Sequence, residues 1–218
     1  MSGQMAPDLR LLNDGLPYAR LCEQLQHDGW EEIGRSEWAW VFGHPRCDLA
    51  IRVTPLDPAF RLFAERVLGA GGVPGFAWID AIHELSGSGY AVVMERLQPV
   101  PMPEAKRFCA EVESDERQGM REFLVALTDE GKRRWASFGG WDSNPRNVMS
   151  RDDGELVITD PVYLDGIALR QALENSDHSA FEGLSAEELT AFCDTPQFGS
   201  GGEGKRALVL ALLKDIRG

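Results

Sequence analysis

The stretch GWDSNPRNVMSRDDGELVITDPV, residues 140–162, holds the pattern that decides the fold. Two apolar runs flank Asp153-Gly154, and this dipeptide is a strong signal for a β-hairpin with a two-residue loop. With that loop, residue 152 faces 155 and residue 149 faces 158. The same register places Asn147 opposite Asp160, and opposed residues on one face of a hairpin have Cβ atoms about 5 Å apart.

An amide oxygen and a carboxylate at that separation form a pair of ligands suited to Mg²⁺. Asp142 lies five residues before Asn147, on a loop that contains Asn144 and Pro145, and can add a carboxylate over the same site. Magnesium held by few protein ligands commonly completes its shell with substrate phosphates, so the pattern favours phosphoryl transfer. The alternative is a surface hairpin whose Asp and Asn residues only form turns.

The rest of the chain predicts strands first and helices afterwards. Helical periodicity predicts a helix near the N-terminus and another that begins at Asp57-Pro58, and the C-terminal half predicts mostly helices, with a break near Gly119 or Gly131. A glycine-rich stretch at 198–204 predicts a loop before a last helix at 205–217. Strands followed by helices indicate the α+β class. The expected strands lie within 30–53, at 76–82 and at 90–95, and the expected helices at 16–26, 57–68, 103–113, 115–138 and 205–217.

The spacing Asp142-x4-Asn147, followed by Asp160, resembles the catalytic loop and the metal-binding Asp of the protein-kinase-like fold. The resemblance implies that Asp142 is the catalytic base and that Asn147 and Asp160 bind magnesium. The forms Asn-Val-Met and Val-Ile-Thr-Asp-Pro resemble the small serine/threonine kinases encoded by tailed phages. The implied fold is bilobal: a β-rich N-lobe with one αC-like helix at 1–98, and a reduced, mostly helical C-lobe at 99–218 that contains the catalytic hairpin 142–162.

The same resemblance implies that ATP is the cofactor, together with Mg²⁺. Residues 34–41 are similar to a degenerate glycine-rich loop, residues 50–52 to the Ala-x-Lys strand, and residues 94–97 to the hinge that holds adenine. A glutamate on the helix after residue 57 stands where the partner of the lysine is expected. The implied ATP-site residues are Gly34, Ser36, Val41, Ala50, Arg52, Glu65, Glu95 and Leu97.

Several positions depart from the kinase pattern. Arg52 replaces the phosphate-binding lysine, and arginine is bulkier and planar. Gly140 and Trp141 replace the usual His-Arg before the catalytic Asp, and Val162 replaces the glycine of Asp-Phe-Gly, with no Ala-Pro-Glu after it. Glu65 lies off the centre of its helix's apolar stripe, which favours a solvated position. The metal ligands are thus expected to be intact and the phosphate clamp altered.

Charge and composition limit the classes of partner that are expected for this chain. The 22 Lys+Arg and 35 Asp+Glu give a formal net charge of −13, which disfavours nucleic acid and anionic membranes and favours a basic protein partner. The four Cys and four His are dispersed, which predicts free thiols and no zinc site. The absence of a long apolar window and of a secretory pattern predicts no membrane span and a cytoplasmic protein, in the host cytoplasm if it is phage-encoded.

Three functions stay open on the sequence. The first is a Ser/Thr protein kinase that modifies host proteins. The second is a kinase-like protein that has lost transfer and acts by binding and inhibiting a partner. The third is a small-molecule kinase of the antibiotic-phosphotransferase type, which shares the Asp-x4-Asn…Asp pattern but carries a histidine-rich loop and a larger helical domain that are lacking here. The acceptor and the oligomeric state are open.

Overall fold

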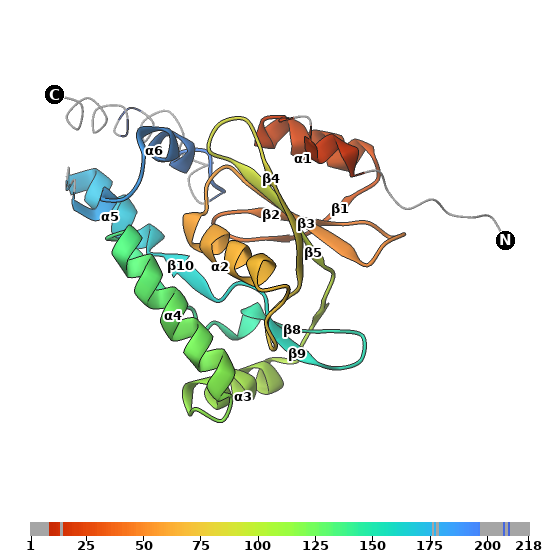
Figure 1. Cartoon of the computed structure of the whole chain (residues 1–218). Coiled ribbons are helices and arrows are strands. Elements are labelled where there is room, and N and C mark those ends of the chain that lie inside the picture. Colours follow the sequence, from red (N-terminus) through yellow and green to blue (C-terminus); the bar gives the residue numbers. More distant parts are fainter. Residues whose placement is uncertain are drawn as a thin grey trace. The chain divides into compact units, whose positions relative to one another are not determined.

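The computed structural model describes residues 9–13, 15–175, 177, 179–196, 207 and 209 (Figure 1). Strands dominate the N-terminal part and helices follow, which confirms the α+β class. The helices are η1 Arg10–Asn13, α1 Tyr18–His27, α2 Pro58–Gly69, α3 Met102–Glu113, α4 Gln118–Arg134, η2 Pro145–Asn147, α5 Gly166–Asn175, η3 Ser179–Phe181 and α6 Ala186–Phe192. The strands are β1 Glu31–Arg35, β2 Trp40–Gly43, β3 Leu49–Thr54, β4 Ile79–Glu84, β5 Tyr90–Glu95, β6 Gln98–Pro99, β7 Phe138–Trp141, β8 Val148–Ser150, β9 Leu156–Ile158 and β10 Val162–Leu164.

The predicted loop at 198–204 lies outside the described residues. So does the predicted helix at 205–217, apart from Ala207 and Val209, which are helical. Every helix within the described part of the chain is too short or too polar to cross a bilayer.

The described residues form two compact units that alternate along the sequence. The strand unit comprises Met1–Asp57, Asp80–Glu95 and Leu184–Gly218, and the helical unit comprises Pro58–Ile79 and Arg96–Gly183. The helix after Asp57 thus belongs with the later helices rather than with the strands that surround it in sequence. The division into domains at residue 98 stays a prediction.

The strand unit is built on a five-stranded sheet in the order β1-β2-β3-β5-β4. Helix α1 contributes Leu21 and Leu25, both fully buried, to a core shared with Ile51 and other apolar strand residues. The helix ends where predicted: the N–H of Trp30 donates to the carbonyl of Leu25 at 2.9 Å, and Gly29 takes the left-handed conformation at φ 88°. This is a Schellman cap, which favours glycine at that position.

The helical unit is held together by aromatic packing. A cluster is formed by Phe63 of α2, Phe123 of α4, and Phe76, which lies between α2 and β4. The ring centroids of Phe76 and Phe123 are 4.8 Å apart. Helix α4 runs through Gly131 without a break, so the predicted interruption there is wrong, whereas α3 ends at Glu113 and α4 begins at Gln118, next to Gly119, the other predicted place. A Cβ on Gly131 would lie 2.3 Å from the ring of Phe138, which shows that this glycine makes room for a strand residue.

Candidate functional site

The predicted hairpin forms from β8 and β9, but the predicted register differs from the observed one by one residue. Val148 pairs with Ile158 and Met149 with Val157. The loop has three residues rather than two, because the N–H of Arg151 donates to the carbonyl of Glu155 at 2.9 Å. Gly154 closes it in the left-handed conformation at φ 87°, which is the usual end of a three-residue hairpin loop.

The shift changes what lies opposite Asn147. Thr159 takes the position predicted for Asp160, and its N–H and Oγ1 both donate to the carbonyl of Asn147, at 2.8 and 3.1 Å. The one-residue slip would be expected to separate the Asn147 side chain from Asp160, because neighbouring strand residues point to opposite faces. The contact is kept through the backbone of Asp160 instead.

The side chain of Asn147 connects the three predicted site residues, because it bonds to both Asp142 and Asp160. Its Nδ2 donates to Oδ2 of Asp142 at 2.9 Å and to the carbonyl of Asp160 at 2.7 Å. A carboxylate and a carbonyl can only accept, so the nitrogen of the amide must face both of them. This orientation leaves Oδ1 as the remaining ligand atom, and within the described residues it accepts no hydrogen bond.

Strand pairing places Asp142 beside this amide. β7 and β10 are antiparallel, with Trp141 opposite Val162, and the N–H of Asp142 donates to the carbonyl of Pro161 at 2.8 Å. The loop after Asp142 is then fixed by two side-chain turns. Oδ1 of Asp142 accepts from the N–H of Asn144 at 3.0 Å, and Oδ1 of Asn144 accepts from the N–H of Arg146 at 3.1 Å and caps η2.

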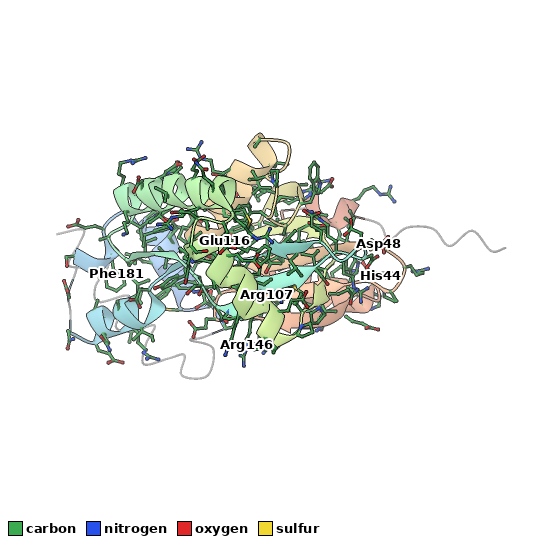
Figure 2. The ribbon with its side chains drawn as sticks, turned by 90° about the horizontal axis from the view of Figure 1, so that it is seen from below. His44, Asp48, Arg107, Glu116, Arg146 and Phe181 are labelled. Carbon is green, nitrogen blue, oxygen red and sulfur yellow. The ribbon has the colours of Figure 1, made fainter. Side chains whose placement is uncertain are left out.

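Helix α3 packs against η2; Arg107 lies on α3 and Arg146 on η2 (Figure 2). It brings Cys109, which the sequence did not mark, close to the site. Burial raises the pKa of the Cys109 thiol, and the negative charges of Glu113 and Asp142 raise it further. The thiol is therefore protonated at neutral pH and has little nucleophilic character.

The donor chemistry of the site fits magnesium. Amide and carboxylate oxygens are the ligands this cation prefers. Among the described residues, no group of three His, Cys, Asp or Glu side chains lies close enough to hold a metal on its own. A magnesium ion here would depend on phosphate oxygens and water for most of its shell, as predicted for a site with few protein ligands.

Arg52 and Glu65 each form an ion pair with a residue that is near in the sequence. Arg52 on β3 is only 4% exposed and donates to Asp57, which is 3% exposed. Glu65 on α2 accepts from Nε of Arg61 at 2.8 Å, one turn earlier on the same helix, and its side chain is 44% exposed. The solvated position expected for Glu65 is confirmed.

The segment predicted to cover ATP is a tight turn between β1 and β2. Oγ of Ser36 accepts from the N–H groups of Trp38 and Ala39 at 3.2 and 3.1 Å. Gly34 pairs with Val41, and a Cβ on it would make only ordinary contact, 3.7 Å from Val41. Two backbone donors that a phosphate-binding loop would offer to a ligand are thus used within the turn.

The other residues implied for ATP binding are divided between the two units. Ala50 pairs with Met94 in the sheet of the strand unit, where Leu49 pairs with Glu95. Leu97 is buried and belongs to the helical unit, to which Glu65 and the Asp142 loop also belong. Their roles in nucleotide binding stay predictions.

No protein-family model matches the chain, and no curated protein matches it. Among solved structures, the chain is similar to the crystal structure of Rad53 1-466 in complex with AMP-PNP, with 16% sequence identity and a TM-score of 0.35. The match covers 79% of this chain and 48% of the Rad53 chain, so this chain spans about half the length of that protein. A similarity at this TM-score decides nothing about function.

Proposed function

We propose that this chain is a Mg-ATP-dependent phosphotransferase with a protein-kinase-like fold that phosphorylates Ser or Thr in other proteins. The observation that carries the proposal is the Asn147 amide, whose nitrogen donates to both Asp142 and Asp160. That bond pattern supports the roles implied by the Asp-x4-Asn…Asp spacing. It leaves Oδ1 of Asn147 as the remaining ligand atom and fixes the orientation of the Asp142 carboxylate.

In this proposal Asp142 orients the acceptor hydroxyl and takes its proton. Each oxygen of Asp142 already accepts one hydrogen bond, from Asn144 and from Asn147, and each keeps capacity for another. Because both bonds are made within the loop, the carboxylate needs no reorganisation when the hydroxyl arrives. Asn147 Oδ1 and the Asp160 carboxylate would hold magnesium, which neutralises phosphate charge when bound.

The proposed substrates are basic proteins. A net charge of −13 attracts a positively charged partner and repels nucleic acid. With the resemblance to phage-encoded kinases, this makes proteins of a bacterial host the proposed targets, in the host cytoplasm.

A second candidate is a kinase-like protein that has lost transfer and acts by binding a partner. Two observations favour it. Arg52 is buried in an ion pair with Asp57, and the turn at Ser36 uses its own N–H groups. Both features would reduce what the strand unit can offer to the phosphates of a nucleotide.

Transfer of label from γ-labelled ATP with Mg²⁺ into a bacterial lysate separates these functions. Wild type is compared with Asp160→Asn and with Asp152→Asn, a matched control on the exposed loop of the same hairpin. Circular dichroism establishes that all three are folded. Label in protein bands that disappears only in Asp160→Asn supports the kinase. Label only in small molecules supports the antibiotic-type enzyme, and no label from folded wild type supports the binding protein.

A further inference from the structure

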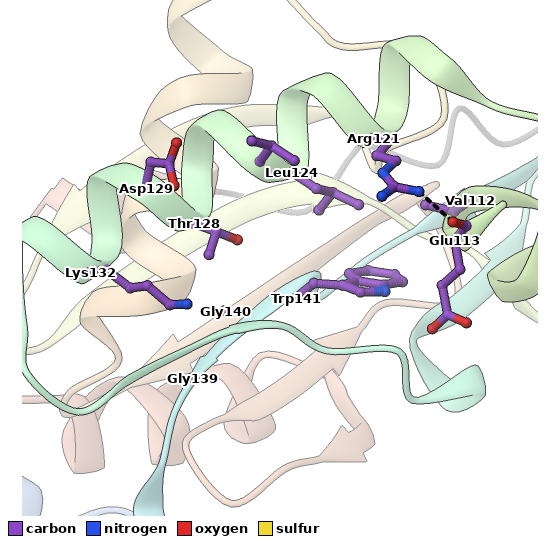
Figure 3. A pocket seen from close by; sticks show the side chains of 11 residues that line it. Val112, Glu113, Arg121, Leu124, Thr128, Asp129, Lys132, Gly139, Gly140 and Trp141 are labelled. Atoms are coloured by element: carbon purple, nitrogen blue, oxygen red, sulfur yellow. Dashed lines mark hydrogen bonds between the residues drawn. The ribbon is translucent and has the colours of Figure 1, made fainter. Parts of the chain in front are cut away.

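A cavity of about 360 Å³ lies in the helical unit, beside the strand that leads to Asp142 (Figure 3). Its volume is within the range of pockets that hold small organic ligands. It is formed by the end of α3, one side of α4 and strand β7. The lining residues are Val112, Glu113, Arg121, Leu124, Val125, Thr128, Asp129, Lys132, Gly139, Gly140 and Trp141.

Three hydrogen-bond donors around this cavity have no acceptor within the described chain. Figure 3 shows the Lys132 ammonium and the Thr128 hydroxyl pointing from α4 toward β7, and neither forms a hydrogen bond or ion pair with a described residue. Nε1 of Trp141 is buried and likewise has no acceptor among them. Of the three, only Trp141 Nε1 is a buried donor without a partner, which costs free energy and commonly marks the place of a ligand or water, whereas Lys132 is exposed and Thr128 half-buried.

The other charges of the cavity wall do not cancel these donors. Arg121 is occupied by Asp115, with Nε and Oδ1 2.9 Å apart, and by the carbonyl of Glu113. In Figure 3 the carboxylates of Asp129 and Glu113 point away from the space between α4 and β7. That space therefore presents a positive charge and neutral donors.

The remaining lining is apolar. Leu124 and the Trp141 ring lie on opposite sides of the space, on α4 and β7 (Figure 3), and Val125 is 52% exposed. An apolar wall with a few convergent polar groups is the usual composition of a small-molecule site.

We propose that this cavity binds a small organic carboxylate with an apolar body. Its carboxylate accepts from Lys132 and Thr128, and its body packs between Leu124 and the indole ring of Trp141. The inference is independent of the proposed phosphotransfer, because it uses none of Asp142, Asn147 and Asp160. A ligand there would contact the strand that leads to Asp142.

Titration of ¹⁵N-labelled protein with 3-phenylpropionate tests this site. The indole N–H resonance of Trp141 is assigned from its loss in Trp141→Phe. We expect it to shift and saturate with the carboxylate, and to need at least about tenfold more of the neutral 3-phenylpropionamide, because a charge-assisted hydrogen bond is lost. Lys132→Met should weaken carboxylate binding by a similar factor.

Lys106→Met is the matched control, since Lys106 is exposed on α3 and does not line the cavity. It should bind the carboxylate as wild type does. The proposal is overturned if the Trp141 resonance does not move up to the solubility limit of the probe. It is also overturned if acid and amide bind equally, or if Lys132→Met, with an otherwise unchanged spectrum, binds like wild type.

Discussion

Replacing Asn147 by Asp tests the orientation of the amide on which the site depends. The change keeps the size of the side chain and converts its nitrogen into an oxygen. In the protein that nitrogen lies 2.9 Å from Oδ2 of Asp142 and 2.7 Å from the carbonyl of Asp160. Asn147→Asp thus removes both hydrogen bonds and sets two carboxylates against each other, so that one of them must be protonated or displaced.

The expected loss of stability has two parts. A hydrogen bond to a charged group contributes about 1.5–3 kcal/mol and one to a neutral carbonyl about 1 kcal/mol, and because Asn147 is half-buried, water recovers part of this. We therefore expect Asn147→Ala, which adds no charge, to cost about 2 kcal/mol. In Asn147→Asp, repulsion between two charges about 4 Å apart adds up to about 4 kcal/mol at an effective dielectric constant near 20.

Repulsion between the two carboxylates makes the loss of stability in Asn147→Asp depend on pH. The pair raises a carboxyl pKa in the folded state, so the folded protein retains a proton that the unfolded chain releases above about pH 4. Stability of the variant relative to wild type therefore falls as the pH rises from about 4 to 7. Urea denaturation across this range measures the effect.

The matched control is Asn144→Asp. The side chain of Asn144 accepts a hydrogen bond from Arg146, which a carboxylate also does, so this variant should lose much less stability as the pH rises. Equal losses for Asn147→Ala and Asn147→Asp at every pH would refute the assignment of the amide nitrogen. The argument that Oδ1 is available to a metal would fail with it.

Three further variants or conditions test the packing. Asp57→Ala leaves a buried arginine without this carboxylate and should cost about 3–5 kcal/mol in urea denaturation, and a loss below 1 kcal/mol would contradict the buried ion pair. Gly75→Ala should melt at a lower temperature than Gly87→Ala. A Cβ on Gly75 would lie 2.4 Å from Sδ of Met120, whereas Gly87 has the same left-handed backbone but open space around it. Equal melting temperatures would disprove the close approach. Burial raises the pKa of the Cys22 thiol from 9.0 to about 12. The unfolded chain therefore loses this proton first, and stability should fall more steeply between about pH 9 and 12 in wild type than in Cys22→Ala, which keeps only the similar contribution of Cys109.

The hairpin at 148–158 shows what local sequence predicts and what it does not. The apolar runs and the glycine predicted two antiparallel strands correctly, because strand propensity and a left-handed turn residue are local properties. The register depended on whether the loop contains two residues or three. Asp153 decided this, since its Oδ1 accepts from the N–H of Glu155 at 3.0 Å and supports the longer loop. An Asp-Gly pair is compatible with both loops, so the dipeptide alone could not distinguish them.

The ion pairs of Arg52 and Glu65 lie beyond what sequence spacing can show. Helical periodicity correctly placed Glu65 away from the apolar stripe, because that depends on neighbours within two turns. Nothing local marks Asp57 as the partner of Arg52. Its carboxylate compensates a charge on β3 that is 4% exposed, a contact set by how the chain returns after the strand.

The grouping of Asp142 with Asn147 survived the wrong register because a separate local structure produces it. Asn144 and Pro145 start η2, and the N–H of Asn147 donates to the carbonyl of Asn144 at 2.9 Å. This single turn reverses the chain, so that the side chain of Asn147 returns to Asp142. Asp160 is then reached through its carbonyl, which does not depend on the face to which its side chain points. The spacing between Asp142 and Asn147 is therefore the structural requirement. Inserting one residue between Asn144 and Asn147 should separate the amide from the carboxylate even if both strands still pair.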